Sequence, residues 1–214
     1  MFLDFSHTIE HGMITYKGLP APLICDYLSR QKSREFYTPG TEFQIGRIDM
    51  VANTGTYVDS PFHRYADGKD LSQLSLENLA DLDALVVHTN SQSVDADLFR
   101  NLPVGGRAVL VHTGWSQHWR TDRYFENHPY LTEDAADFLA EARVLLVGID
   151  SHNIDDTRTN SRPVHSRLLG AGIPIAEHLC GLERAPAQGL RFFAVPPKIA
   201  GFGTFPVRAF GICA

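Results

Sequence analysis

Three short apolar runs constrain the fold of this chain most strongly. They lie in residues 83–88, 107–112 and 143–150, and each has a centre of consecutive apolar residues between charged or polar ends. Runs this short and this rich in Val and Leu are typical of buried strands. We therefore expect three core strands.

Residues 132–142 predict an amphipathic helix. Thr132 is suited to N-capping, acidic residues fill the first turn, and apolar residues recur at 135, 138, 139 and 142. This spacing places the apolar side chains on one helix face.

The rest of the chain adds weaker patterns. Further strands are expected at 43–52, 191–195 and 207–212, with a solvated helix at 29–35 and a Pro- and Gly-rich connection at 196–206. The mixture of strands and helices predicts an α/β or α+β fold.

Size and charge limit the class of protein. The chain has 214 residues, is 43% hydrophobic and shows no break in composition, so we expect one domain spanning 1–214. Its net charge of −6 offers no basic surface for a phosphate backbone. We expect a small-molecule substrate and no nucleic-acid partner.

No cationic leader and no window of about 18 apolar residues is found, so we expect a cytoplasmic protein without a membrane partner. The three cysteines, Cys25, Cys180 and Cys213, are far apart and odd in number. This pattern predicts reduced thiols, not a disulfide framework or a Cys-x-x-Cys metal site.

Asp59 and His63 are the first candidates for a chemical role. Gly55 before them and Pro61 between them favour a loop after a strand and disfavour a helix. Asp59 can give an anionic oxygen to a metal ion, and His63 can bind a metal or carry a proton. Taken alone, the pair fits a turn-capping aspartate and a solvated histidine better.

Residues 163–177 predict a short helix, a glycine-rich turn and a buried strand, with His165 and Glu177 twelve residues apart. Glu177 follows an apolar run, and a buried carboxylate needs a metal or a charged partner. A salt bridge to Arg167 or Arg184 is the alternative to a metal.

These residues resemble the cyclase family of metal-dependent hydrolases, which includes bacterial kynurenine formamidases and isatin hydrolases. The family motif H-x-G-T-H-x-D-x-P-x-H is matched by residues 53–63, Asn-Thr-Gly-Thr-Tyr-Val-Asp-Ser-Pro-Phe-His, and the spacing of His165 and Glu177 also matches. The similarity covers nearly the whole chain. It implies a single β/α/β domain with a mixed, barrel-like central sheet flanked by helices, and a homo-oligomer such as a dimer or tetramer.

The resemblance also implies a metal site. In the family, two histidines and the Asp hold one ion, usually Zn or Mn, and the Asp, the late His and the Glu can hold a second. Here Asn53 and Tyr57 occupy the histidine positions, and neither supplies the imidazole nitrogen that Zn²⁺ favours. We expect one divalent ion per chain, Zn or Mn, at Asp59, His165 and Glu177 with an added oxygen from Asn53.

The implied activity is hydrolysis of a C–N amide bond in a small formamide or cyclic amide, as in arylformamidase (kynurenine formamidase) of tryptophan catabolism. His63 is the expected general base and acid, and Tyr57 the donor to the oxyanion. Phe62 and Trp115 are the expected stacking surface for an aromatic substrate. Two alternatives stay open: an inactive ligand-binding or scaffolding member, and a metal-assisted cyclase or lyase.

Overall fold

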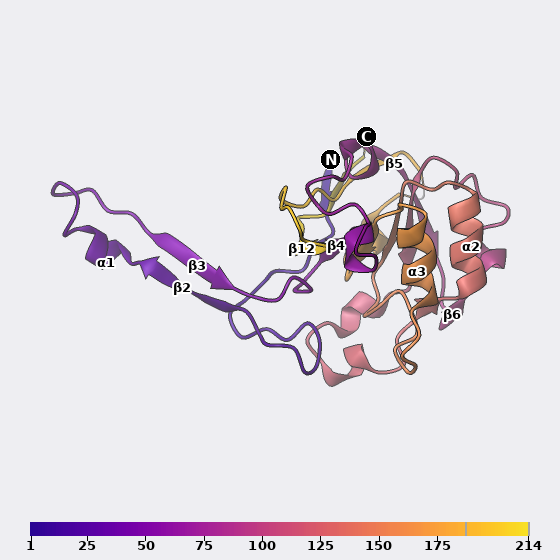
Figure 1. Cartoon of the computed structure of the whole chain (residues 1–214), viewed down its shortest axis with the longest axis horizontal. Coiled ribbons are helices and arrows are strands. Elements are labelled where there is room, and N and C mark those ends of the chain that lie inside the picture. The colour runs from indigo at the N-terminus through magenta and orange to yellow at the C-terminus, as the bar shows by residue number, and fades with distance from the viewer. Residues whose placement is uncertain (187, 214) are drawn as a thin grey trace.

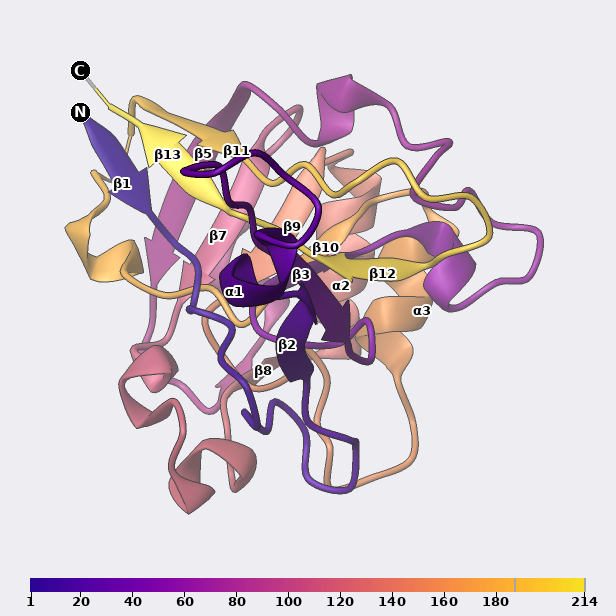
Figure 2. The same cartoon turned by 90° about the vertical axis from the view of Figure 1, so that its left-hand side faces the viewer.

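A curled nine-stranded sheet forms the centre of the computed structural model, which describes residues 1–186 and 188–213. The strands, in their order across the sheet, are Phe2–Asp4 (β1), Phe210–Ile212 (β13), Leu190–Phe193 (β11), Leu82–His88 (β5), Ala108–His112 (β7), Leu146–Ile149 (β9), Ile175–Glu177 (β10), Tyr57–Asp59 (β4) and Thr204–Pro206 (β12). Figure 2 shows β1 beside both chain termini at one edge and β12 near α3 at the other. The expected mixed α/β fold is confirmed.

The remaining elements are short. Two pairs of strands stand outside the large sheet: Leu23–Leu28 (β2) with Ile45–Asp49 (β3), and Ser93–Val94 (β6) with Tyr130–Leu131 (β8). The α-helices are Arg30–Ser33 (α1), Glu133–Glu141 (α2) and Pro163–Gly170 (α3). The 3-10 turns are Pro61–His63 (η1), Leu76–Asn78 (η2), Ala96–Leu98 (η3), Trp115–His118 (η4), Asp122–Phe125 (η5) and Leu182–Arg184 (η6).

The three predicted core strands are β5, β7 and β9, which run parallel to one another and to β10. The outer pairings of the sheet are antiparallel. Parallel strands are covered on both faces, which explains why these segments are continuously apolar instead of alternating.

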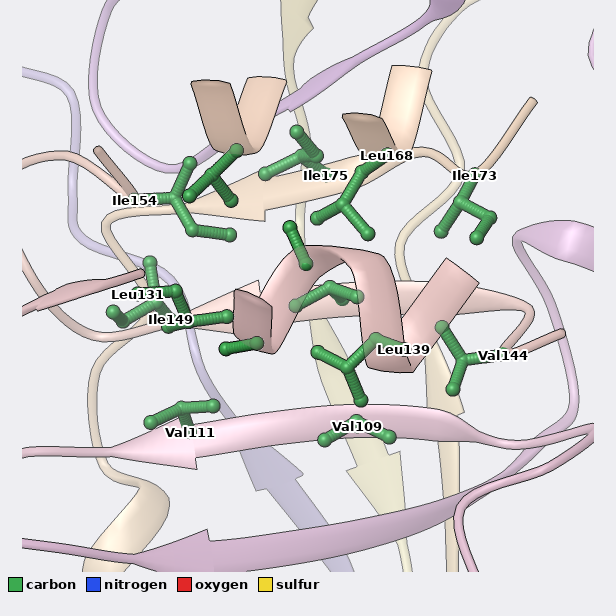
Figure 3. Close-up of a cluster of buried hydrophobic side chains, with 14 of the residues drawn as sticks. Val109, Val111, Leu131, Leu139, Val144, Ile149, Ile154, Leu168, Ile173 and Ile175 are labelled. Atoms are coloured by element: carbon green, nitrogen blue, oxygen red, sulfur yellow. The ribbon is translucent and has the colours of Figure 1, made fainter. Parts of the chain in front are cut away.

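Side chains fill both faces of the sheet. On one face, Val109, Ile149 and Ile175 pack against Leu139 of α2 and Leu168 of α3 (Figure 3). On the other face, a second cluster is built by side chains of the sheet strands and the segments that border them. The helix expected at 132–142 is thus confirmed as α2, with its apolar stripe on the core.

Thr132 occupies the N-cap position of α2 but makes no capping bond with its side chain. Its hydroxyl donates to the carbonyl oxygen of Val94 instead. The Thr132 hydroxyl, which was expected to cap the helix, is therefore bonded to the backbone of the neighbouring strand β6.

The strand expected at 43–52 is confirmed with shorter bounds, but it lies outside the nine-stranded sheet. It is β3, in which every residue is exposed, and it pairs only with β2. Residues 23–49 form an arm that projects away from the body of the molecule (Figure 1). The helix expected at 29–35 is the single turn α1 within this arm.

Two further expectations need correction. The connection at 196–206 contains β12, an edge strand that tolerates Pro206 because one side of an edge strand needs no hydrogen bonds. Residues 61–63 form one 3-10 turn instead of an open loop, since Pro61 at its first position needs no N–H partner.

The expected helix, turn and strand at 163–177 are confirmed as α3, a turn and β10. The three cysteines are free thiols, as expected. Within the described residues, no helix has the length and apolar character to span a bilayer.

Candidate functional site

Asp59 ends β4 where three strands meet. It is opposite Ile175 of β10 and Thr204 of β12 in the sheet register, and its side chain is fully buried. The Thr204 hydroxyl donates to Oδ1 of Asp59, whereas Oδ2 has no hydrogen-bond partner among the described residues. A buried carboxylate oxygen of this kind calls for a cation or a bound water.

His165, in the first turn of α3, is oriented by Asp155. The carboxylate of Asp155 accepts the backbone N–H groups of Val164 at 2.8 Å and His165 at 3.0 Å. Its Oδ2 also lies 2.6 Å from Nδ1 of His165. A carboxylate on Nδ1 fixes the ring so that Nε2 is directed at Asp59.

His63 lies in η1, beside Asp59. Its Nδ1 is 2.8 Å from the hydroxyl oxygen of Thr204. Because that hydroxyl gives its proton to Asp59, its oxygen accepts a proton from Nδ1 of His63. Nε2 of His63 is then the unprotonated nitrogen, on a side chain that is 36% exposed.

Asp59, His63 and His165 together fit a divalent cation. Each offers one ligand atom, and the three atoms lie within 4.8 Å of one another. Nε2 of His165 is 3.6 Å from Oδ2 of Asp59 and 3.8 Å from Oε1 of Glu177. These separations are too long for hydrogen bonds and suit atoms that surround a shared ion.

Glu177, at the end of β10, is fully buried and held from two sides. Its Oε1 accepts the backbone N–H of Ile154 at 2.6 Å, and its Oε2 accepts the hydroxyl of Tyr57 at 2.5 Å. The Tyr57 hydroxyl also lies 2.8 Å from that of Tyr16. His165 and Glu177 are at opposite ends of their helix-to-strand unit in sequence, but the chain reverses between them and brings them together.

Neither arginine forms the salt bridge that was the alternative for Glu177. Arg167 pairs with Glu133 on the surface at 2.7 Å, and Arg184 donates to the backbone oxygens of Gly181 and Asp4. The buried Glu177 carboxylate is instead stabilised by the backbone N–H of Ile154, the hydroxyl of Tyr57 and the nearby imidazole of His165.

The charges of this cluster depend on one another. Burial opposes the charged form of His165, but the carboxylates of Asp155, Asp59 and Glu177 raise its pKa to about 10. Burial raises the pKa of Glu177 to about 7, while His165 acts in the opposite direction. Without a cation, protonated His165 is therefore the counter-charge of the buried acids.

Tyr57 and its neighbour Tyr16 stay protonated. Burial, with the nearby charge of Glu177, raises the pKa of both phenols well above the usual value of 10. Tyr57 is therefore a hydrogen-bond donor to Glu177 in this site.

The remaining predicted site residues lie in a loop and in two 3-10 turns. Asn53 is half-buried in the loop before β4, and Phe62 is half-buried in η1 next to His63. Trp115 lies in η4, where its indole N–H donates to the carbonyl oxygen of Tyr124 at 3.0 Å. The Trp115 ring lies against His118 of η4 and the guanidinium of Arg123 of η5.

Sequence patterns did not indicate Asp155, Thr204 or Tyr16 as site residues. Asp155 caps α3 from eight residues before the helix begins, outside the spacing of a local cap. Thr204 lies in the segment interpreted as a connection. Only the topology brings these residues to the site.

Comparison with known proteins assigns the family. The Cyclase family model, described as "Putative cyclase", matches residues 3–156. The chain belongs to the cyclase family. Among curated relatives, the kynurenine formamidase of Geobacillus thermodenitrificans (strain NG80-2) is 31% identical over 168 residues, covering 77% of this chain and 78% of the relative. That of Bacillus anthracis is 24% identical over 210 residues, covering 97% of this chain and 95% of the relative.

Solved structures agree with the family assignment. A potential metal-dependent hydrolase with cyclase activity is 26% identical and superposes with a TM-score of 0.80, covering 99% of this cyclase-family chain and 96% of its own. Isatin hydrolase A from Labrenzia aggregata has a TM-score of 0.81 at 20% identity, covering 100% and 93% of the two chains. The second comparison shows the shared fold.

Proposed function

We propose that this cyclase-family protein is a metal-dependent hydrolase that cleaves the C–N amide bond of a small formamide or cyclic amide, as arylformamidases do. The observation that carries the proposal is the geometry of Asp59. Its unpartnered, buried Oδ2 faces Nε2 of His165, whose other nitrogen is fixed by Asp155. A buried carboxylate and an oriented imidazole are the usual elements of a catalytic metal site. The kynurenine formamidase relatives support amide hydrolysis.

One Zn or Mn ion per chain would be held by Asp59, His165 and Glu177, with an oxygen from Asn53. When bound, the ion supplies a Lewis acid for the substrate carbonyl and makes water more acidic. Oxygen and imidazole donors suit either metal.

His63 has a ligand atom within 4.8 Å of those of Asp59 and His165, but we assign it the role of general base and acid and not that of a metal ligand. Thr204 accepts a proton from Nδ1 of His63, so Nε2 is free to take a proton from water and return it to the leaving nitrogen. Asp59 stabilises this arrangement through the Thr204 hydroxyl. The three residues thus form a chain that fixes the tautomer of His63.

Phe62, adjacent to His63, is the proposed stacking surface for an aromatic amide. We do not place Trp115 in this stacking surface, because its ring packs on His118 and under Arg123. We place the protein in the cytoplasm, in keeping with its free thiols.

The direct test compares the wild-type chain with an Asp59→Ala/His165→Ala variant. We expect about one Zn or Mn ion per chain by elemental mass spectrometry, and hydrolysis of N-formyl aromatic amines or cyclic amides, both lost in the variant. His118→Ala, which changes a histidine outside the site, is the matched control and keeps both. A wild-type chain without metal and without hydrolysis contradicts the proposal and favours a ligand-binding member of the family.

We also propose that the protein is a homo-oligomer joined through the arm. Its strands pair only with each other, and several large apolar side chains on it are exposed: Tyr27, Phe36, Phe43 and Ile48. An isolated two-stranded hairpin is marginally stable in water, so it needs another surface.

The charge of the arm indicates a second copy of the chain as that partner. The arm has four basic residues, Arg30, Lys32, Arg34 and Arg47, and four acidic ones, Asp26, Glu35, Glu42 and Asp49. The arm is therefore neutral, while the rest of the chain carries the net charge of −6. A surface with balanced charges and exposed apolar side chains suits self-association better than binding to a strongly charged partner.

A further inference from the structure

The polar groups behind Glu177 form an ordered chain. Tyr57 has one hydroxyl proton and gives it to Oε2 of Glu177 at 2.5 Å. The Tyr16 hydroxyl lies 2.8 Å from the Tyr57 oxygen and 3.0 Å from the carbonyl oxygen of His152, so its one proton is shared between these two acceptors. Asn153 in turn donates to the Tyr16 hydroxyl at 3.1 Å. The Tyr57 proton points toward the carboxylate, and linked hydrogen bonds of this kind strengthen one another.

This chain fixes the rotation of the Glu177 carboxylate. Oε2 faces the tyrosines, and Oε1 faces Nε2 of His165 at 3.8 Å. Oε1 accepts the backbone N–H of Ile154 with one lone pair and faces His165, so its second lone pair is the one available to an ion there. Glu177 is thus prepared as a single-oxygen ligand on one side.

The space beside Oε2 of Glu177, where Tyr57 lies, does not fit a second ion. The Tyr57 ring is 1% exposed and fills the space there, and its hydroxyl proton points at Glu177, not away from it. An ion in this place would have to displace the proton that Tyr57 gives to Oε2 of Glu177.

We propose that the Tyr16–Tyr57 pair takes the place of a second metal ion in holding Glu177, so that the chain binds one ion and Tyr57 is a positioning residue for the Glu177 ligand. The inference rests on the metal site of the proposed function. It gives Tyr57 a different task from donation to a substrate oxyanion, since its only proton is already bound by Glu177.

The test is a calorimetric titration of metal-free protein with Mn²⁺ and, separately, Zn²⁺. We expect one ion per wild-type chain and one ion, bound about 10- to 100-fold more weakly, in Tyr57→Phe, the size of effect seen when a group that orients a metal ligand is removed. Tyr16→Phe should weaken binding less, because Tyr57 keeps its own bond to Glu177. Tyr124→Phe is the matched control: Tyr124 is fully buried, but its hydroxyl meets His178 at 2.8 Å.

The converse variant restores two imidazoles. Asn53→His/Tyr57→His should bind two ions per chain. Two ions in the wild type, or equal affinities in Tyr57→Phe and Tyr124→Phe when circular dichroism shows both folded, would overturn the inference.

These titrations contain no substrate, which separates the two proposals. If the metal affinities of the wild type and its variants fall in the expected order but the protein hydrolyses no amide, only the proposed function is rejected. Hydrolysis by a wild type whose affinity equals that of Tyr57→Phe rejects the tyrosine inference alone.

Discussion

Asp155 links the start of α3 to Nδ1 of His165, because one carboxylate accepts two backbone N–H groups and orients the imidazole. We predict that Asp155→Asn lowers the free energy of unfolding by about 2 kcal/mol, since it weakens charged hydrogen bonds in a buried place and removes an anion from a helix N-terminus. The measurement is urea unfolding of the metal-free protein. The adjacent Asp156→Asn is the control, because Asp156 pairs with Arg158 on the surface at 2.8 Å and its loss should cost under about 1 kcal/mol. Equal losses in the free energy of unfolding in the two variants would show that the Asp155 carboxylate stabilises the fold no more than a surface carboxylate does.

Sequence patterns correctly predicted the secondary-structure elements whose apolar side chains pack in the core. The strands β5, β7 and β9 and the helix α2 were predictable because their apolar residues face the two clusters of the core. In the arm, a strand and a helix were predicted, but its projection from the body was not, since β3 is exposed throughout; β12 was missed because it relies on its place at a sheet edge. Within the site, the pairing of Asp59 with His165 followed from family spacing, whereas Thr204 and Asp155 reach it only through the topology.

The arm formed by residues 23–49 allows a test of the proposed oligomer. Tyr27→Ser/Phe36→Ser replaces side chains that are 75% and 67% exposed, so it leaves the core untouched. If the arm joins two copies, the variant should be monomeric by size-exclusion chromatography with light scattering at concentrations where the wild type is oligomeric. Leu76→Ser is the control, because Leu76 is 61% exposed on the body. An oligomer that survives the arm variant, or one lost in Leu76→Ser as well, contradicts the proposed interface.

For the whole molecule, buried neutral histidines link stability to pH. His7, His128, His152 and His178 come from separate parts of the chain, and burial lowers the pKa of each. Protonating any of them in the folded state places a charge in a site that offers it little solvation. Since rings of His128 and His178 both lie within 6 Å of that of His152, these groups also oppose one another's protonation. Acid is therefore expected to weaken the whole fold and not a single element.

His152 provides the sharpest test of this linkage. Burial lowers its folded-state pKa to about 3, against about 6.5 when unfolded, so between these values the unfolded chain binds the extra proton and stability falls as the pH falls. At pH 5 this histidine alone should cost about 2 kcal/mol relative to pH 7.5. Nδ1 of His152 has no hydrogen-bond partner among the described residues, so His152→Phe sacrifices no bond there and should lose about 2 kcal/mol less than the wild type over that range. Urea unfolding at both pH values measures the difference. If His152→Phe loses as much stability as the wild type, the acid sensitivity arises elsewhere in the molecule.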